Sequence, residues 1–286
     1  MSVATERIAP TVGAGARTVP PAGFRRSRLA FPLLVALVVG TLYFLIPLLA
    51  TIQSSLDEGR GFTFDAYRNF LRDGDFYRTI STSLFYAFLT VVGSVVLIFP
   101  TAYWVNLRMP WFRPVMTLVT FLPFVIPPVI LSLALQQAWG GTGPIPIALV
   151  GTPLLLAGAY VVLSFPYMYG AIDNGLRAMD IHTLTEAAQS LGANLGTILI
   201  RVILPNLWPA VVSGALLSFS IVMGEFVLAS LFNYFTFPIY LNYRGQNEPH
   251  VAAALTVFSF AITWICLGLI QLLSRRAPGA APVATR

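Results

Sequence analysis

The amino-acid sequence predicts an all-α, polytopic membrane protein with six transmembrane helices. Of its 286 residues, 57% are hydrophobic and only 10% are charged, and the mean hydropathy is +0.78. Soluble domains usually carry about 25% charged residues, so this composition indicates a chain embedded in lipid. The few charged residues also separate apolar runs of roughly 20 residues or more, which is the length that a helix needs to cross a bilayer.

The N-terminal segment 1–28 is rich in Ala, Pro, Gly and Thr and is expected to be a flexible tail. The apolar run that follows has full span length, whereas the apolar core of a signal peptide has about 7–15 residues. We therefore expect no cleavable signal. The predicted permanent spans cover about 29–52, 79–107, 114–138, 147–172, 207–233 and 251–274, followed by a tail at 275–286.

The third and fourth spans come from one uncharged stretch that is too long for a single helix. Its "GGTGPIP" segment (140–146) supplies Gly and Pro residues that break helices, and we expect a turn there. Pro123, Pro127 and Pro128 in "FLPFVIPPVI" are expected to kink the third span, because proline removes a helical hydrogen bond.

Arginine residues indicate how the spans are oriented. They lie before the first span and after the sixth, between the second and third, and between the fourth and fifth. The positive-inside rule places all these ends, and so both termini, in the cytoplasm. The long outer loop 53–78 is expected to carry an amphipathic helix, "FDAYRNFLRD".

The residue inventory excludes several classes of function. All seventeen basic residues are Arg, so the chain has no lysine for a Walker phosphate loop. Two widely separated histidines, His182 and His250, and one cysteine, Cys266, supply neither a metal ligand set nor a buried Ser–His pair. We expect no cofactor or metal in this chain, and the scattered arginines do not form a nucleic-acid surface.

One partly polar module, "TLTEAAQSLGANLGTILIRVILP", stands between the fourth and fifth spans. Thr183 and Glu186 have the spacing of a capping box, which predicts a helix that begins at Leu184. Gly192 is placed to adopt the left-handed conformation that ends a helix. A helix over about 184–191 is too short to be stable alone, so we expect a partner surface to hold it.

The string "EAAQSLG", followed by nine residues and "VILP", resembles the EAA loop of the transmembrane permease subunits of ABC importers, with Val202 where the family usually has Ile. The segments 62–87 and 247–257 are also similar to polyamine-type members. The resemblance implies a type I ABC importer permease fold and a bacterial cytoplasmic membrane location.

In that family the loop, here 173–206, forms a coupling helix that sits in a cleft of the cytoplasmic ATPase. The resemblance implies polar contacts for Glu186, close packing for small residues and a turn at Gly192. The resemblance also implies three kinds of partner: two ATPase subunits that bind Mg-ATP, a second permease subunit in a heterodimer, and an extracytoplasmic substrate-binding protein. The outer loop 53–78 is either a landing surface for that binding protein or a simple connection between spans. The implied ATPase-coupling residues are Thr183, Glu186, Ala187, Ala188, Gly192, Leu204 and Pro205.

Glu225 is the one acid within the fifth apolar run. A charge at the bilayer centre costs about 2.5–3.5 kcal/mol on insertion scales, so such an acid tends to face a cavity or a partner. It either lines a path for a cationic substrate or hydrogen-bonds a neighbouring helix or the outer interface. Six aromatic residues near these spans either stack on alkylammonium groups or are ordinary packing residues: Tyr160, Phe165, Tyr167, Tyr169, Phe226 and Tyr234. The candidate residues of the substrate path are Glu225, Tyr160, Tyr167 and Phe226.

The resemblance and Glu225 together favour spermidine or putrescine as the solute. The same permease role for 2-aminoethylphosphonate, ferric ion, an opine or a sugar is the alternative. Two alternatives come from other classes of protein. An ATP-independent channel or carrier would have no use for a coupling helix, and an intramembrane enzyme would need a metal ligand set or a buried Ser–His pair, which this chain does not supply.

Overall fold

The structure, a computed structural model, describes residues 26–57, 61–141 and 148–275. The chain forms two units, Met1–Leu48 and Leu49–Arg286. The described part of the first unit is helix α1 (Arg26–Leu56), which continues into the second. The remaining helices are α2 (Asp65–Arg72), α3 (Gly74–Arg108), a 3₁₀ turn (Pro110–Phe112), α4 (Arg113–Val125), α5 (Pro128–Ala138), α6 (Pro153–Arg177), α7 (Ile181–Ser190), α8 (Leu195–Thr197), a π-helix (Ile198–Ile203), α9 (Leu204–Gly224), α10 (Val227–Leu231), α11 (Phe237–Asn247) and α12 (Pro249–Arg275).

The predicted set of spans agrees with this helical structure. Five helices of the described residues are long and apolar enough to cross a membrane, and the pair α4 and α5 makes a sixth span if it is counted as one. Helix α1 begins at Arg26, so residues 26–28 of the expected tail are helical. Residues 1–25, 276–286 and most of the "GGTGPIP" turn lie outside the described residues.

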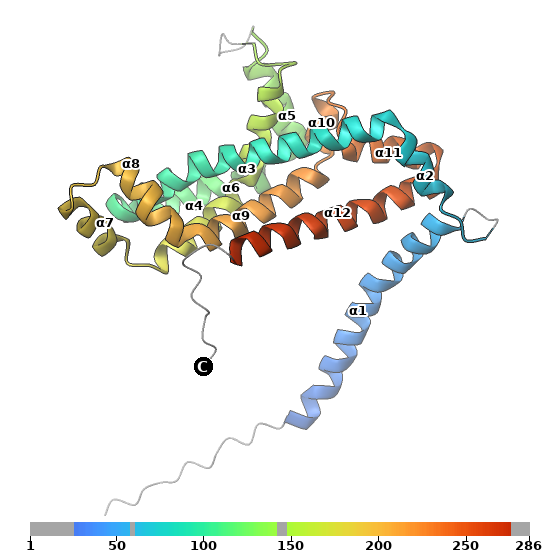
Figure 1. Ribbon diagram of the computed structural model, residues 1–286, viewed down its shortest axis with the longest axis horizontal. Helices are drawn as coiled ribbons and strands as arrows, with labels where there is room; N and C mark the ends of the chain where they lie inside the picture. Colours follow the sequence, from blue (N-terminus) through green and yellow to red (C-terminus); the bar gives the residue numbers. More distant parts are fainter. Residues whose placement is uncertain (1–25, 58–60, 142–147, 276–286) are drawn as a thin grey trace, which may run out of the picture. The chain divides into compact units, whose positions relative to one another are not determined.

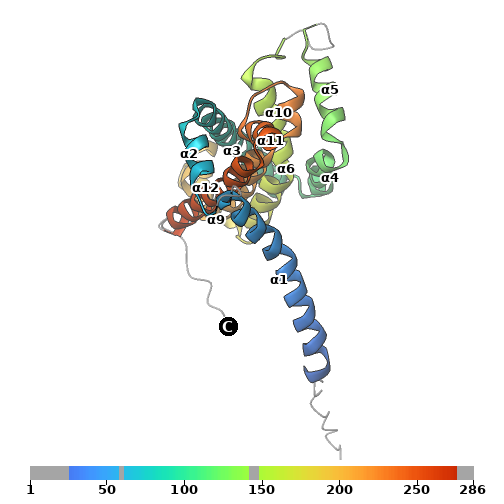
Figure 2. The ribbon, with the colours of Figure 1, turned by 90° about the vertical axis from the view of Figure 1, so that its right-hand side faces the viewer.

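The third span is not the single kinked helix that the sequence predicted over 114–138. Helices α4 and α5 meet at an angle of 103° (Figure 2). Ile126 adopts an extended conformation, φ −86° and ψ 117°, because the proline that follows disfavours a helical residue before it. Pro127 and Pro128 therefore break the span, whereas Pro123 lies inside α4.

The fifth span, predicted over 207–233, is also broken. Helix α9 ends at Gly224, Glu225 is extended with φ −78° and ψ 116°, and the short α10 follows. The predicted amphipathic helix in the outer loop is confirmed as α2, which buries Ala66 and Phe70. Sequence patterning missed α11, which stands where a simple loop was expected.

Helices α3, α6, α9 and α12 run lengthwise through the second unit, with α7 and α8 at one end and α2 and α11 at the other (Figure 1). Small residues let α6 and α9 approach closely, as is common between helices in lipid. A Cβ atom at Gly175 of α6 would lie 2.6 Å from the Ala210 Cβ and from the Leu207 Cδ1 of α9. At Gly214 of α9, it would lie 2.9 Å from the Met168 sulfur.

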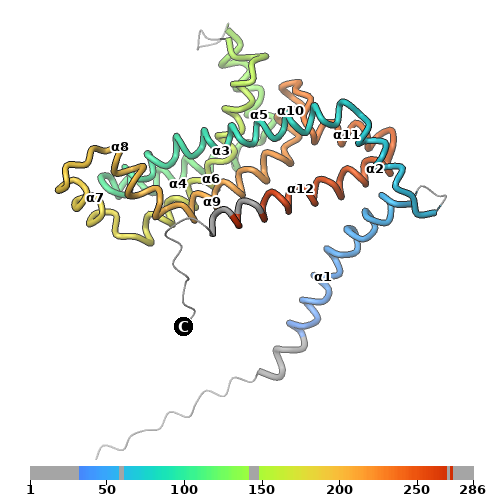
Figure 3. Tube along the Cα trace, viewed as in Figure 1, coloured from blue at the N-terminus to red at the C-terminus, as the bar shows by residue number. Residues whose placement is uncertain are grey.

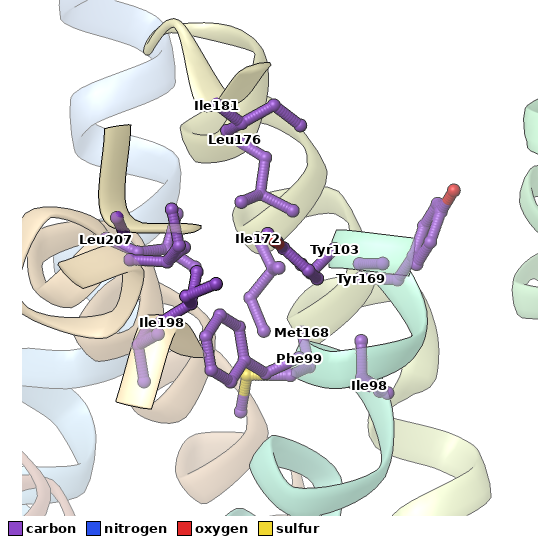
Figure 4. Close-up of a cluster of buried hydrophobic side chains, with 14 residues drawn as sticks. Ile98, Phe99, Tyr103, Met168, Tyr169, Ile172, Leu176, Ile181, Ile198 and Leu207 are labelled. Atoms are coloured by element: carbon purple, nitrogen blue, oxygen red, sulfur yellow. The ribbon is translucent and has the colours of Figure 1, made fainter. Parts of the chain in front are cut away.

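The largest buried cluster lies near the end that carries α7 (Figure 4). It joins Phe99 and Tyr103 of α3, Met168 and Ile172 of α6, and Leu207 of α9. Ile181 and Ala188 of α7 belong to the same cluster. The short helix α7 is therefore held in part by the hydrophobic core of its own chain.

Candidate coupling and transport sites

Helix α7 closes one end of the second unit. The chain leaves α6, turns into α7 and returns through α8 and the π-helix into α9 (Figure 3). Both long helices next to α7 are thus covalently joined to it by short connections. A displacement of α7 would act on α6 and α9 directly.

The N-terminus of α7 differs from the predicted capping box. The helix begins at Ile181, and its N-cap is Asp180 rather than Thr183. The Asp180 carboxylate accepts hydrogen bonds from the Thr183 hydroxyl at 2.6 Å and the Thr183 amide at 3.2 Å. These bonds lower the pKa of the Asp180 carboxyl. An acid three residues upstream of Thr183 is an equally good cap, and this leaves the Glu186 carboxylate free for an outside contact.

The C-terminus of α7 confirms the predicted left-handed conformation of Gly192, whose φ is +78°. The Gly192 amide donates to the Gln189 carbonyl at 2.8 Å, and the Ala193 amide donates to the Ala188 carbonyl at 3.0 Å. This pair of bonds is a Schellman motif, which satisfies the last carbonyls of a helix.

The two faces of α7 differ. Glu186 and Ala187 are exposed, whereas Ala188 and Thr185 are buried. The Thr185 hydroxyl donates to the Ile181 carbonyl at 2.6 Å, so the buried Tyr103 hydroxyl of α3, 3.0 Å away, must donate to it. Sequence reasoning missed this bond, because nothing local pairs a tyrosine of α3 with the loop.

A groove of about 200 Å³ runs along the exposed side of α7. Arg108 at the end of α3 stands opposite the α7 residues that line it, which include His182, Glu186 and Gln189. Leu204 and Pro205, the last of the predicted coupling residues, lie farther along the chain and form the first turn of α9, directly after the π-helix. The structure therefore brings Thr183, Glu186 and Ala187 onto one helix and sets Leu204 and Pro205 at the junction with a span.

Glu225 lies at the break between α9 and α10 and is half-buried. Its carboxylate accepts hydrogen bonds from the amides of Leu228 at 2.9 Å and Ala229 at 3.2 Å. These donors are the otherwise unpaired amides at the start of α10. Glu225 thus hydrogen-bonds the neighbouring helix α10, as one of the two sequence interpretations expected, although neither included the break in the span that it caps.

Tyrosines from three segments surround this break. The Tyr86 ring of α3 makes edge contacts with Tyr160 of α6, at 6.1 Å between centroids, and with Tyr234 at 5.9 Å. The Tyr160 and Tyr234 hydroxyls are buried and make no hydrogen bond. The Tyr160 hydroxyl lies close to the Glu225 carboxylate without the geometry of a bond.

The remaining predicted path residues do not all join this group. Phe226 is 38% exposed and lines a neighbouring groove with Phe237 and Asn242. Tyr167 instead packs on Phe124 of α4, at 5.6 Å between ring centroids. Phe165 and Tyr169 belong to the core near α7. Tyr86 was missed, since α3 and α6 show no shared sequence pattern.

Through the described ranges 26–57, 61–141 and 148–275, no three His, Cys, Asp or Glu side chains gather to hold a metal ion. The fold is that of a polytopic helical membrane protein. Residues 94–277 match the model of the family "Binding-protein-dependent transport system inner membrane component", and the chain belongs to this family.

Among curated relatives, the chain is 35% identical over 123 residues to a probable sulfate transport system permease of Chlorella vulgaris, covering 41% of this chain and 46% of that protein. It is 34% identical to the molybdenum transport permease ModB of Mycobacterium tuberculosis, over 48% of this chain and 56% of that protein. These matches thus span about half the length of each relative. The chain is 29% identical to the spermidine/putrescine permease PotC of Haemophilus influenzae, over 82% of this chain and 93% of that protein.

A solved bacterial alginate ABC transporter, in complex with an alginate pentasaccharide-bound periplasmic protein, contains a chain of similar fold. Its TM-score is 0.70, with 16% identity, over 88% of this chain and 95% of that chain. The prediction of an all-helical type I importer permease fold is confirmed. These relatives are transport subunits and not enzymes.

Proposed function

We propose that this chain is the transmembrane permease subunit of an ABC importer that carries a polyamine, spermidine or putrescine, into the cell. The observation that carries the proposal is the similarity to polyamine permeases along nearly the whole chain. Similarity to the sulfate and molybdenum permeases is confined to less than half of it. The acid and the tyrosines at the broken fifth span agree with a cationic solute.

Coupling to ATP takes place at α7 in this proposal. The exposed Glu186 and Ala187 face a partner ATPase, and Gly192 sets the turn that returns the chain to the membrane. Two such ATPases hydrolyse Mg-ATP, and their closure moves α7 and the long helices joined to it. Nucleotide shifts the balance between inward-facing and outward-facing arrangements to the extent that its affinity for the two differs.

The partners follow from the same proposal. One set of six spans does not enclose a path, and two ATPases require two coupling helices, so a second permease subunit, a different chain, completes the pore. Both termini and α7 face the cytoplasm, and a substrate-binding protein delivers the solute at the opposite end, where α2 and α11 lie (Figure 1).

The substrate region is built around Glu225 and the Tyr86, Tyr160 and Tyr234 rings. Carboxylates and aromatic faces both attract alkylammonium groups, and each cation–π contact contributes about 0.5–2 kcal/mol. The buried Tyr234 hydroxyl, which has no hydrogen-bond partner, offers an acceptor to the N–H groups of such a solute, and the Tyr160 hydroxyl lies beside the Glu225 carboxylate.

Uptake of labelled spermidine tests the substrate. Vesicles that contain this chain, its partner subunits and the binding protein should accumulate spermidine only with ATP, and unlabelled putrescine should compete while sulfate and molybdate should not. Accumulation of labelled sulfate or molybdate instead would replace the polyamine proposal with an oxyanion permease. That alternative is favoured by the sulfate and molybdenum permeases, which have higher identity over shorter matched segments.

Two variants test the sites separately. Glu186→Lys should abolish uptake and reduce the amount of ATPase that purifies with the membrane subunits, while insertion stays normal. Glu225→Gln should keep the ATPase bound and raise the KM for spermidine, because an amide retains hydrogen bonding but not the charge. Normal transport by Glu186→Lys would refute the coupling role, and an unchanged KM in Glu225→Gln would remove Glu225 from the path.

A further inference from the structure

A buried polar cluster lies where α3, α4 and α6 meet, close to α7. Its centre is Asp173 of α6, which is 9% exposed. The Asn106 side-chain amide of α3 donates to the Asp173 Oδ1 at 2.7 Å, and the Arg177 Nε of α6 donates to Oδ2 at 3.2 Å. The Arg113 Nε, at the first residue of α4, lies 4.0 Å from Oδ1, and the Arg113 guanidinium also donates to the Asn106 carbonyl oxygen.

The cluster matters most for α4, which is otherwise loosely packed. Only Thr120 and Pro123 of α4 are buried. A groove of about 210 Å³, lined by Ile98, Val119 and Phe165 among others, separates its middle from α3 and α6. A second groove of about 370 Å³ lies between the start of α4 and α3. Interfaces with such gaps lose dispersion contacts. The polar cluster is therefore a main attachment at this end of α4, beside the packing of Met116 on the hydrophobic core.

The same cluster lies next to both attachments of α7. Asp173 is on α6, which continues directly into α7 after Arg177. Asn106 lies less than one turn beyond Tyr103 on α3, and Tyr103 donates to the buried Thr185 of α7. Each helix that fixes α7 therefore also contributes a group to the attachment of α4.

We propose that Asp173, Asn106 and Arg113 are positioning residues that make the broken span α4–α5 follow the coupling helix. The inference rests on the proposed coupling role of α7. The Arg113 Nε makes no hydrogen bond of its own, so Arg113 is held by its charge beside Asp173 and by the bond from its guanidinium to Asn106, which itself donates to Asp173. Loss of one partner from such a partly buried pair leaves a charge that is less well compensated. The cluster thus joins α3, α4 and α6 into one body at the α7 end, so a movement of α7 changes the position of α4.

The contributions of the two arginines separate this role from simple stability. Arg113 links Asp173 to α4, whereas Arg177 lies four residues after Asp173 on the same helix and its side chain is 51% exposed. Both carry the same charge and both contact Asp173. Arg113→Gln should release α4 from α6, whereas Arg177→Gln, the matched control, leaves the contact between the helices in place.

The test uses the assembled transporter in lipid nanodiscs, with Cys266→Ser in this chain and cysteine-free partner subunits. Spin labels are placed at Leu118→Cys of α4 and Trp264→Cys of α12, both exposed positions. The distance distribution between the labels is measured without nucleotide and after trapping with ATP and vanadate. The distribution should shift on trapping in the parent protein, which keeps Arg113, and in Arg177→Gln. The shift should be lost in Arg113→Gln and should return in part in Arg113→Lys.

Co-purification of the ATPase and ATP hydrolysis distinguish a failure of this inference from a failure of the proposed coupling role of α7. If the inference is right, the transporter with Arg113→Gln should retain bound ATPase and hydrolyse ATP. If instead the proposed coupling role of α7 is wrong, the Glu186→Lys variant would show normal ATPase binding and normal uptake. A shift that persists in Arg113→Gln, or no shift in the parent protein, would overturn the inference. Loss of the ATPase from Arg113→Gln would also overturn it, because the cluster would then serve folding and not coupling.

Discussion

Helix α7, which precedes the fifth span, and the Glu225 break within that span are built in different ways. At the α7 end, the caps are local: Asp180 bonds with Thr183, and Gly192 bonds with Gln189. At the Glu225 break, the Tyr86, Tyr160 and Tyr234 side chains come from separate segments, and two of their hydroxyls have no partner. The caps of α7 depend only on neighbours along the chain, whereas the tyrosine cluster depends on contacts between several helices.

The sharpest way to break the α7 module is Gly192→Val. The space around Gly192 is open, but a side chain in the left-handed region costs about 1–2 kcal/mol, and a β-branched residue tolerates it worst. We expect energy-dependent uptake to be lost while insertion is retained, as measured by transport and membrane immunoblotting. Gly192→Asn is the matched control, because Asn tolerates this conformation, and equal loss in both variants would show that conformation is not the cause.

Packing between α6 and α9 at this end predicts the next largest effect. In Gly175→Ala, the new Cβ would lie 2.6 Å from atoms of Ala210 and Leu207, so the helices must move apart. Overpacking of this kind costs about 1–3 kcal/mol, which should lower the melting temperature of the purified protein. Gly158→Ala on the same helix meets nothing within 4 Å and should have no such effect; similar melting in both variants would contradict the close contact.

At the Glu225 end, Tyr160→Phe distinguishes a solute contact from a structural one. The buried Tyr160 hydroxyl makes no hydrogen bond of good geometry, although it lies beside the Glu225 carboxylate, so its removal should change stability little. We expect an unchanged melting temperature together with weaker spermidine uptake, seen as a higher KM. If the KM stays constant, the hydroxyl is not part of the path, and a lower melting temperature would reveal a bond to another group.

The smallest effect is expected at the N-cap of α7, through pH. The pKa of Asp180 is lowered in the folded protein by hydrogen bonds from Thr183, so its stabilising contribution is present at neutral pH. That contribution is lost as the pH falls through the lowered pKa. Asp180→Asn caps without titrating, and thermal unfolding should be less sensitive to acid in this variant. Identical pH profiles would show that the Asp180 charge does not act as a cap.

The parts that could be predicted from the sequence are those set by composition or by neighbours along the chain. Apolar run length gave the spans, and the conformational freedom of glycine gave the turn at Gly192. The prediction of Thr183 as the N-cap was wrong because Asp180, three residues earlier, also has a capping side chain and the helix begins after it. The break at Ile126 follows from the proline after it, where only a kink was predicted, and the break at Glu225 interrupts an apolar run that predicted one continuous helix.

Contacts between side chains of different helices could not be predicted from the sequence. Tyr86, Tyr103 and Asp173 act on residues far away in the sequence, and no period or spacing connects them. A lone acid such as Glu225 stands out because charge is costly in lipid, but its two amide partners follow from a helix break that the apolar pattern conceals.

The π-helix at Ile198–Ile203 gives the link between α7 and α9 an unusual reserve of length. Each of its i to i+5 turns holds one residue more than an α-helical turn. Rewinding one such turn as α-helix would free a single residue, and one residue corresponds to about 100° of rotation and 1.5 Å of rise. The connection therefore has a built-in step size, set by backbone geometry, for any twist of α9 relative to α7.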